Sequence, residues 1–282
     1  MDVKMQKLCV LFLTLFFSSQ IYAENYQVFV GVGPGGPADV MVRKLTAEAE
    51  KKSNDKFIII NKPGAEFMIA YQEFIREGQR NKNVMFVNNA GFYINTGLPA
   101  NASLNLRPFD DAKSLITLVS FDMLFISKKD SPIKNMSNVK GKLSLGYVGS
   151  TTKLLADKLN LDPDIALIPY KTDNAGVMAV LSNEVDLATA VDFSTTYLAY
   201  KDSFQVVGNS KKLLNTSSAM GLSVPQSMPD SQVAELNQLF NQVFNDSEFS
   251  SWFVSTYHKK PHGGSPQEFD RIINDYYKKI SK

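Results

Sequence analysis

The sequence is poor in the residues that build disulfides and metal sites, and it has no excess of one charge. Its 282 residues include one cysteine, Cys9, and two histidines, His258 and His262. A single cysteine allows no intramolecular disulfide, and two histidines leave little material for a metal or acid-base site. The 30 basic and 28 acidic side chains give a formal charge of only +2. We therefore expect no nucleic-acid partner and no binding to an anionic membrane surface, but a small or specific ligand.

The rest of the composition is that of a globular protein. Hydrophobic residues make up 44% of the chain, and Gly 16 and Pro 12 are ordinary counts. Disordered and fibrous chains are poorer in apolar residues or richer in Gly and Pro. The length favours two lobes over one.

The N-terminus is typical of a secretory signal peptide, residues 1–23. Lys4 and Lys7 precede the apolar run Leu8 to Phe17, and Ala23 is a plausible cleavage point. The run has about half of the ~20 residues that a transmembrane helix needs, and no second long run follows it. Cleavage would remove Cys9 and a charge of +1, leaving +2 − 1 = +1 on a periplasmic mature chain. The alternative is an uncleaved N-terminal anchor.

The mature chain alternates short apolar strands with amphipathic helices. Short strands are predicted over 27–32, 57–60 and 84–87. Ala38, Met41, Val42 and Leu45 follow a helical period within a predicted helix over 37–51, and further helices are predicted over 247–257 and 266–280. Strands that are apolar on both faces indicate a sheet covered by helices, an α/β fold. Turn-rich stretches at 128–141 and 222–230 predict two crossings between lobes. The predicted lobes are residues 24–125 with 224–282, and residues 126–223.

A glycine-rich loop follows the first predicted strand. Residues 31–36 read G-x-G-x-x-G between a strand and a helix, the context of a dinucleotide site. Pro34 stiffens the turn, however, and the second strand ends at Asn61 where an acid should bind the ribose. We expect no nucleotide and no other cofactor. The glycines still let a ligand approach the backbone, and the following helix N-terminus favours an anion such as a carboxylate. For Asp39 we prefer a role in stabilising the helix dipole.

Two further loops carry small polar residues after predicted strands. Asn88 to Gly91 follows one strand, and Gly149 to Thr152 follows another at the start of a helix. Backbone N–H groups and short side chains of the two loops could bind one anion together. Equally, Ser150 or Thr151 could simply cap its helix.

The sequence offers little for catalysis or metal binding. Pro261 separates His258 from His262 and breaks the helix that would align the two rings, so we expect no metal site. No serine lies on a nucleophile elbow. Asp192, at the end of a predicted strand, could reach an interlobe site, whereas Asp186 more plausibly ends a turn.

Several segments together resemble the Bug-type solute-binding receptors of tripartite tricarboxylate transporters. Gly35-Gly36-Pro37-Ala38-Asp39 with Arg43 is similar to their GG-P-x-D-x-x-x-R segment, and 61–65 is similar to N-R-P-G-A. Residues 168–171 resemble V-P-Y-K, and Pro225 and 266–269 fit the C-terminal order. The likeness runs in register over nearly all of the mature chain.

The resemblance implies a type II periplasmic-binding fold, with two lobes that close over a small organic acid and present it to the membrane permease subunits. It implies no chemistry on the ligand. The residues that would then line the cleft are Gly35, Gly36, Pro37, Asn88, Asn89, Ala90, Gly91, Gly149, Ser150, Thr151, Tyr170, Lys171, Thr172 and Asp192.

The chain also departs from the family pattern. Glu66 and Phe67 stand where the family often has glycine, Tyr147 is unusual, and Thr172 replaces a glycine. These departures bear on the identity of the ligand more than on the fold. Two alternatives remain open: a sensor that keeps the fold without transport, and an enzyme that would use Asp192 and a histidine.

Overall fold

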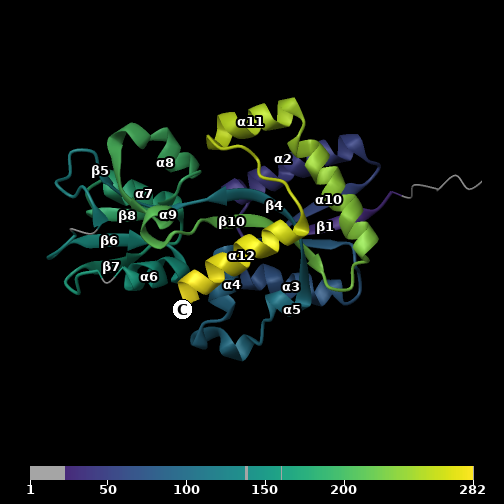
Figure 1. Ribbon diagram of the computed structural model, residues 1–282, viewed down its shortest axis with the longest axis horizontal. Coiled ribbons are helices and arrows are strands. Elements are labelled where there is room, and N and C mark those ends of the chain that lie inside the picture. Colours follow the sequence, from purple (N-terminus) through teal and green to yellow (C-terminus); the bar gives the residue numbers. More distant parts are fainter. Residues whose placement is uncertain (1–22, 137–138, 160, 282) are drawn as a thin grey trace, which may run out of the picture.

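The computed structural model describes residues 23–136, 139–159 and 161–281. The expected signal peptide, apart from Ala23, lies outside the described residues. The described chain forms two lobes, each built on a five-stranded sheet (Figure 1).

The first lobe has a mixed sheet in the order β2-β1-β3-β10-β4. Its strands are β1 (Asn25–Val30), β2 (Lys56–Asn61), β3 (Val84–Asn89), β4 (Ala112–Phe121) and β10 (Ser218–Pro225). β1 is parallel to β2 and β3, and β10 is antiparallel to β3 and β4. β1, β2 and β3 are strands that the sequence predicted, and β4 and β10 are additional.

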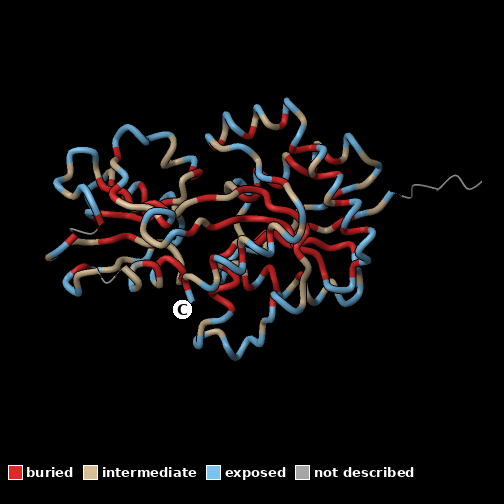
Figure 2. Tube along the Cα trace, in the orientation of Figure 1, coloured by how far each residue is buried: buried red, intermediate tan, exposed pale blue. Residues whose placement is uncertain are grey.

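Helices cover both faces of this first sheet. They are α2 (Pro37–Lys52), α3 (Met68–Gly78), α4 (Ala90–Thr96), α5 (Pro108–Asp111), α10 (Asp230–Phe244), α11 (Ser247–Tyr257) and α12 (Pro266–Ser281), with short 3-10 turns η1 (Ala65–Phe67) and η2 (Pro99–Leu104). α2, α10 and α11 share one hydrophobic core with the sheet, and α3, α4 and α12 share the other. In Figure 2 the buried segments follow the strands, and the helices expose their outer faces.

The second lobe repeats the plan with the order β7-β6-β8-β5-β9. Its elements are β5 (Met123–Lys128), β6 (Ser144–Tyr147), α6 (Gly149–Lys158), β7 (Ala166–Pro169), α7 (Asp173–Leu181), β8 (Leu187–Val191), α8 (Thr195–Ala199), η4 (Lys201–Ser203), β9 (Phe204–Asn209) and α9 (Ser210–Leu214). β6 is parallel to β7 and β8, whereas β5 is antiparallel to β8 and β9.

The chain crosses between the lobes at positions other than the expected ones. β4 ends at Phe121 and β5 begins at Met123, so only Asp122 separates the two sheets, and the return crossing is residues 215–217. The Ser217 hydroxyl donates to the Asp122 carboxylate at 2.6 Å, which joins the two crossings. The turn-rich stretches at 128–141 and 222–230 therefore do not connect the lobes. The chain passes between the sheets in only one to three residues, so the crossings do not show the Pro-, Gly- and Ser-rich composition by which a linker is recognised in a sequence.

Contacts outside the crossings also hold the lobes together. α6 of the second lobe packs against α4 and α12 of the first, and Leu155 joins the core of α3 and α4. In Figure 1, α12 runs diagonally across the molecule and ends beside α6. Phe193, just after β8, is buried in the core of the first lobe, where its ring lies 5.2 Å from Phe121 and 6.1 Å from Tyr257.

Candidate functional site

The glycine-rich loop between β1 and α2 is open on one side. A Cβ atom added at Gly33 or Gly35 would meet nothing within 4 Å. Gly35 has φ +82°, a conformation that glycine adopts without strain, and Pro37 occupies the first turn of α2. At Gly33 and Gly35 the loop therefore exposes bare backbone in front of a 16-residue helix.

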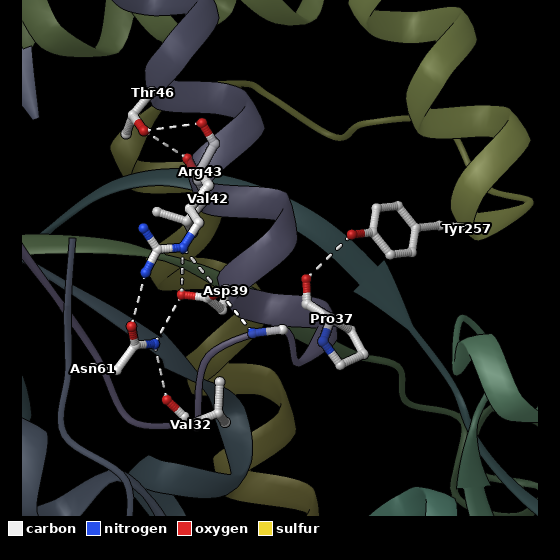
Figure 3. A network of polar contacts seen from close by, with 9 residues as sticks. Val32, Pro37, Asp39, Val42, Arg43, Thr46, Asn61 and Tyr257 are labelled. Atoms are coloured by element: carbon white, nitrogen blue, oxygen red, sulfur yellow. Dashed lines mark hydrogen bonds and ion pairs between the residues drawn. The ribbon is translucent and has the colours of Figure 1, made fainter.

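A buried polar network fixes the shape of this loop (Figure 3). The Asp39 carboxylate is 2% exposed; it accepts hydrogen bonds from Gly35 N at 2.9 Å, Asn61 Nδ2 at 2.8 Å and Arg43 Nε at 3.0 Å. Asn61 Nδ2 also donates to the Val32 carbonyl at 3.0 Å. Burial would raise the pKa of Asp39, but these hydrogen bonds lower it below 3.8. Asp39 thus ties the loop to α2 and β2, consistent with a structural role.

The start of α6 lies against the first lobe and holds a carboxylate. The Ser150 backbone N–H donates to both oxygens of Glu66 at 3.0 Å, and the Ser150 hydroxyl donates to Oε1 at 2.8 Å. The backbone at Gly149 has φ +77°, and an added Cβ would lie 3.0 Å from Glu66 Oε2. Next to it, the Thr151 hydroxyl donates to the Gly91 carbonyl at 3.1 Å. Two loops that the sequence placed at strand ends are therefore in contact across the lobes.

The segment that carries Glu66 has an unusual backbone. Ala65, Glu66 and Phe67 have φ of 45°, 50° and 75°, three consecutive left-handed residues without glycine. Each such residue costs of order 1–3 kcal/mol unless its surroundings hold it. The Phe67 ring lies against the backbone of Gly31, where an added Cβ would come within 2.4 Å of the ring. Phe67 and Glu66 thus anchor the segment on either side, at the glycine-rich loop and at α6.

The four residues of the 88–91 loop do not share one role. Asn88 is fully buried and donates to the Ser223 hydroxyl at 2.7 Å, within the first lobe, and Ala90 is also fully buried. Asn89 caps α4 by accepting from the Phe92 N–H at 2.9 Å. Gly91 lies directly against the second lobe, beside Thr151.

The 170–172 segment is mainly structural in its contacts. The Tyr170 ring packs over Gly146 of β6, and its hydroxyl donates to Glu184 at 2.7 Å. Lys171 is exposed, and Thr172 caps α7 by accepting from the Ala175 N–H at 3.2 Å.

Asp192 forms an ion pair between the lobes. Its carboxylate lies 2.5 Å from Lys259 Nζ, just after α11, and the two side chains are 20% and 26% exposed. Burial raises the pKa of Asp192, although the Lys259 ammonium opposes this shift. Nearby, the Tyr257 hydroxyl donates to the Pro37 carbonyl at 3.2 Å. The end of β8, the end of α11 and the start of α2 are thereby joined.

Comparison with known proteins identifies the family. The profile described as "Tripartite tricarboxylate transporter family receptor" matches residues 41–210. The chain belongs to this receptor family. A UPF0065 protein of Bordetella pertussis is 24% identical over 210 residues, which is 69% of this chain. The chain spans 64% of that relative's length.

Solved structures show the same receptor fold. "R. palustris Rpa4515 with adipate" has a TM-score of 0.73 and 16% identity, covering 90% of this chain and 94% of that one. "MatC (Rpa3494) from Rhodopseudomonas palustris with bound malate" has a TM-score of 0.71 and 17% identity, covering 91% and 99%. The predicted resemblance to Bug-type receptors and the type II periplasmic-binding fold are confirmed.

Several contacts in this receptor were not predicted from the sequence. Tyr257 and Lys259 reach the interlobe region from a C-terminal segment that contained no recognisable site motif. Glu66 was visible as a departure from the family, but not as a partner of Ser150. The two histidines do not converge: the His262 ring contacts Ser120 and Glu268, and His258 ends α11.

Among residues 23–136, 139–159 and 161–281, no cluster of His, Cys, Asp or Glu could hold a metal ion. Over these same ranges, the receptor has no helix that combines the length and apolar character needed to cross a membrane.

Proposed function

We propose that this chain is a periplasmic receptor that binds a small carboxylate between its lobes and delivers it to the permease subunits of a tripartite tricarboxylate transporter. The observation that carries the proposal is the start of α6, where the backbone N–H and hydroxyl of Ser150 hold the carboxylate of Glu66. A helix N-terminus stabilises an anion through its unpaired N–H groups and its dipole.

Three further observations support the proposal. The chain belongs to a family of solute-binding receptors. Two proteins of similar fold are described with adipate and with malate, which are both dicarboxylates. The near-neutral charge of the chain fits an anion held by N–H and hydroxyl groups better than one held by a basic patch.

Thermal unfolding of the mature chain against mono-, di- and tricarboxylates and amino acids tests this function. A ligand at one hundred times its dissociation constant should stabilise the chain by about 2.7 kcal/mol. At this size that corresponds to a rise in melting temperature of roughly 5–10 °C. If no compound in the panel stabilises the chain, or if one of them is turned over, the receptor function is wrong.

A substitution at Gly36 tests the placement of the ligand. Gly36 has φ −68°, which valine can adopt, and its Cβ position is 3.4 Å from the Gly33 carbonyl oxygen and 3.5 Å from Val32, which are ordinary contacts. Gly36→Val should therefore fold normally but block the approach of the ligand to the backbone, and at least tenfold weaker binding is expected. Ala234→Val, at an exposed position of α10, is the matched control. Unchanged affinity in Gly36→Val would remove this loop from the binding site.

A further inference from the structure

Glu66 places a carboxylate of the chain itself at the start of α6. Glu66 belongs to the first lobe and Ser150 to the second, 84 positions later in the sequence. The contact has the geometry that a bound acid would have, because one N–H serves both carboxylate oxygens and one hydroxyl serves Oε1.

The donors of Ser150 are fully used by this contact. A serine offers one backbone N–H and one hydroxyl proton, and both point to Glu66. A second carboxylate at this place would find no free donor on Ser150. It would also lie beside the negative charge of Glu66, which repels it.

The backbone conformation of the 65–67 loop places Glu66 at this position. Its three left-handed residues turn the chain between Gly64 and α3, and Phe67 fixes the loop on the Gly31 backbone. Ala65 and Glu66 are exposed, so burial of their own side chains does not account for this conformation. Within the part of the chain that the structure describes, the hydrogen bonds of the Glu66 carboxylate all come from Ser150.

We propose that Glu66 is a specificity-determining residue, which supplies one carboxylate from the protein and so selects ligands that carry a single carboxylate. A dicarboxylate would have to displace Glu66 from Ser150 before its second carboxylate could bind there. This inference rests on the proposed function, since it assumes that a small acid binds between the lobes.

The test compares acids of equal length with one or two carboxylates. Isothermal titration at pH 7.5 measures butyrate against succinate and hexanoate against adipate, on the wild type and on Glu66→Gln and Glu66→Ala. Glu235→Gln, at an exposed position of α10, is the control for a lost surface charge. We expect the wild type to prefer the monocarboxylate of a pair at least tenfold. In Glu66→Ala this preference should fall at least tenfold, with Glu66→Gln in between and the control like the wild type.

A second measurement follows the contact without any ligand. Hydrogen exchange of the Ser150 amide should be slow in the wild type and at least tenfold faster in Glu66→Ala. Equal exchange in both proteins would overturn the inference, because Glu66 would then not occupy the donors. Glu66→Gln keeps the size of the side chain, so it serves if Glu66→Ala does not fold.

The outcomes separate the inference from the function on which it rests. If acids bind but Glu66→Ala and Glu66→Gln leave the ratio of mono- to dicarboxylate affinity unchanged, the inference is wrong and the receptor function stands. A wild type that prefers the dicarboxylate likewise overturns the inference alone. If neither the wild type nor Glu66→Ala binds any acid of the wider panel, the receptor function is wrong, and the selectivity inferred from it is wrong as well.

Discussion

Asp39→Asn is the substitution that best tests the structural role of Asp39 at the glycine-rich loop. The Asp39 side chain is 2% exposed and accepts from Gly35, Asn61 and Arg43. An asparagine keeps one acceptor oxygen. In place of the second oxygen it has an NH₂ group, which cannot accept a hydrogen bond from the donors that Asp39 satisfies. The loss of a hydrogen bond to a buried charged group is about 1.5–3 kcal/mol. Arg43 is 48% exposed, so its charge adds little because water screens it.

We therefore expect Asp39→Asn to lower the free energy of unfolding by about 2–3 kcal/mol at pH 7. The effect should depend on pH in a defined direction. The folded pKa of Asp39 is lowered below 3.8, so its stabilisation is fully present above that ordinary value and is lost as the pH falls through the folded pKa. Asparagine does not titrate. The difference between the two proteins should therefore be constant between pH 7 and 5 and shrink below pH 4.

Urea unfolding at pH 7, 5, 4 and 3.5 measures this difference. Asp164→Asn, at an exposed turn before β7, is the matched control and should change the free energy of unfolding by less than about 0.5 kcal/mol. A loss below that size in Asp39→Asn, or a loss that stays constant to pH 3.5, would refute the reasoning. Ligand affinity should fall together with stability, because Gly35 loses the acceptor that holds it.

Two further predictions concern the contacts between the lobes. Phe193→Ala removes a second-lobe ring that is 5% exposed and lies within the first-lobe core. Calorimetry should show that the free energy of unfolding falls by about 3–5 kcal/mol. A fall below about 1 kcal/mol would contradict this packing. Lys259→Met leaves the partly buried Asp192 carboxylate without its cation and should cost about 1–2 kcal/mol at pH 7. Since the folded pKa of Asp192 is raised, the loss of stability in Lys259→Met should be absent below pH 3.8 and grow as the pH rises. An equal loss at pH 3.5 and 7 would refute the role of the ion pair. So would the same loss in the exposed control Lys260→Met.

Helices with a clear amphipathic period were predicted closely, whereas strand β10 was missed. The predicted helix over 37–51 is α2, and the predicted 247–257 and 266–280 are α11 and α12 within one residue. β10, by contrast, is buried at every position but consists largely of small residues. At Gly221 an added Cβ would meet Ile116 O at 2.5 Å, so the strand needs a small residue that weakens its own signal. A strand of this kind is recognised only when its neighbours are known.

The interlobe contacts were predictable only in part, because they join distant segments. The sequence indicated that the loops at 88–91 and 149–151 could meet, and Gly91 and Thr151 do so. It could not show that Asn88 turns into the first-lobe core. No local sequence pattern predicts that Glu66 contacts Ser150 in the other lobe, because this contact depends on the position of one lobe relative to the other.

If Glu66 sets the ligand as proposed, the residues that identify the family and those that set the ligand are different residues. Asp39, Arg43 and Asn61 carry much of the sequence resemblance, and their side chains bond mainly to one another and to the loop backbone. They specify the shape of the loop. Glu66, which departs from the family pattern, contacts the start of α6 in the other lobe. We therefore expect the selectivity of this receptor to follow position 66 more closely than the family motif.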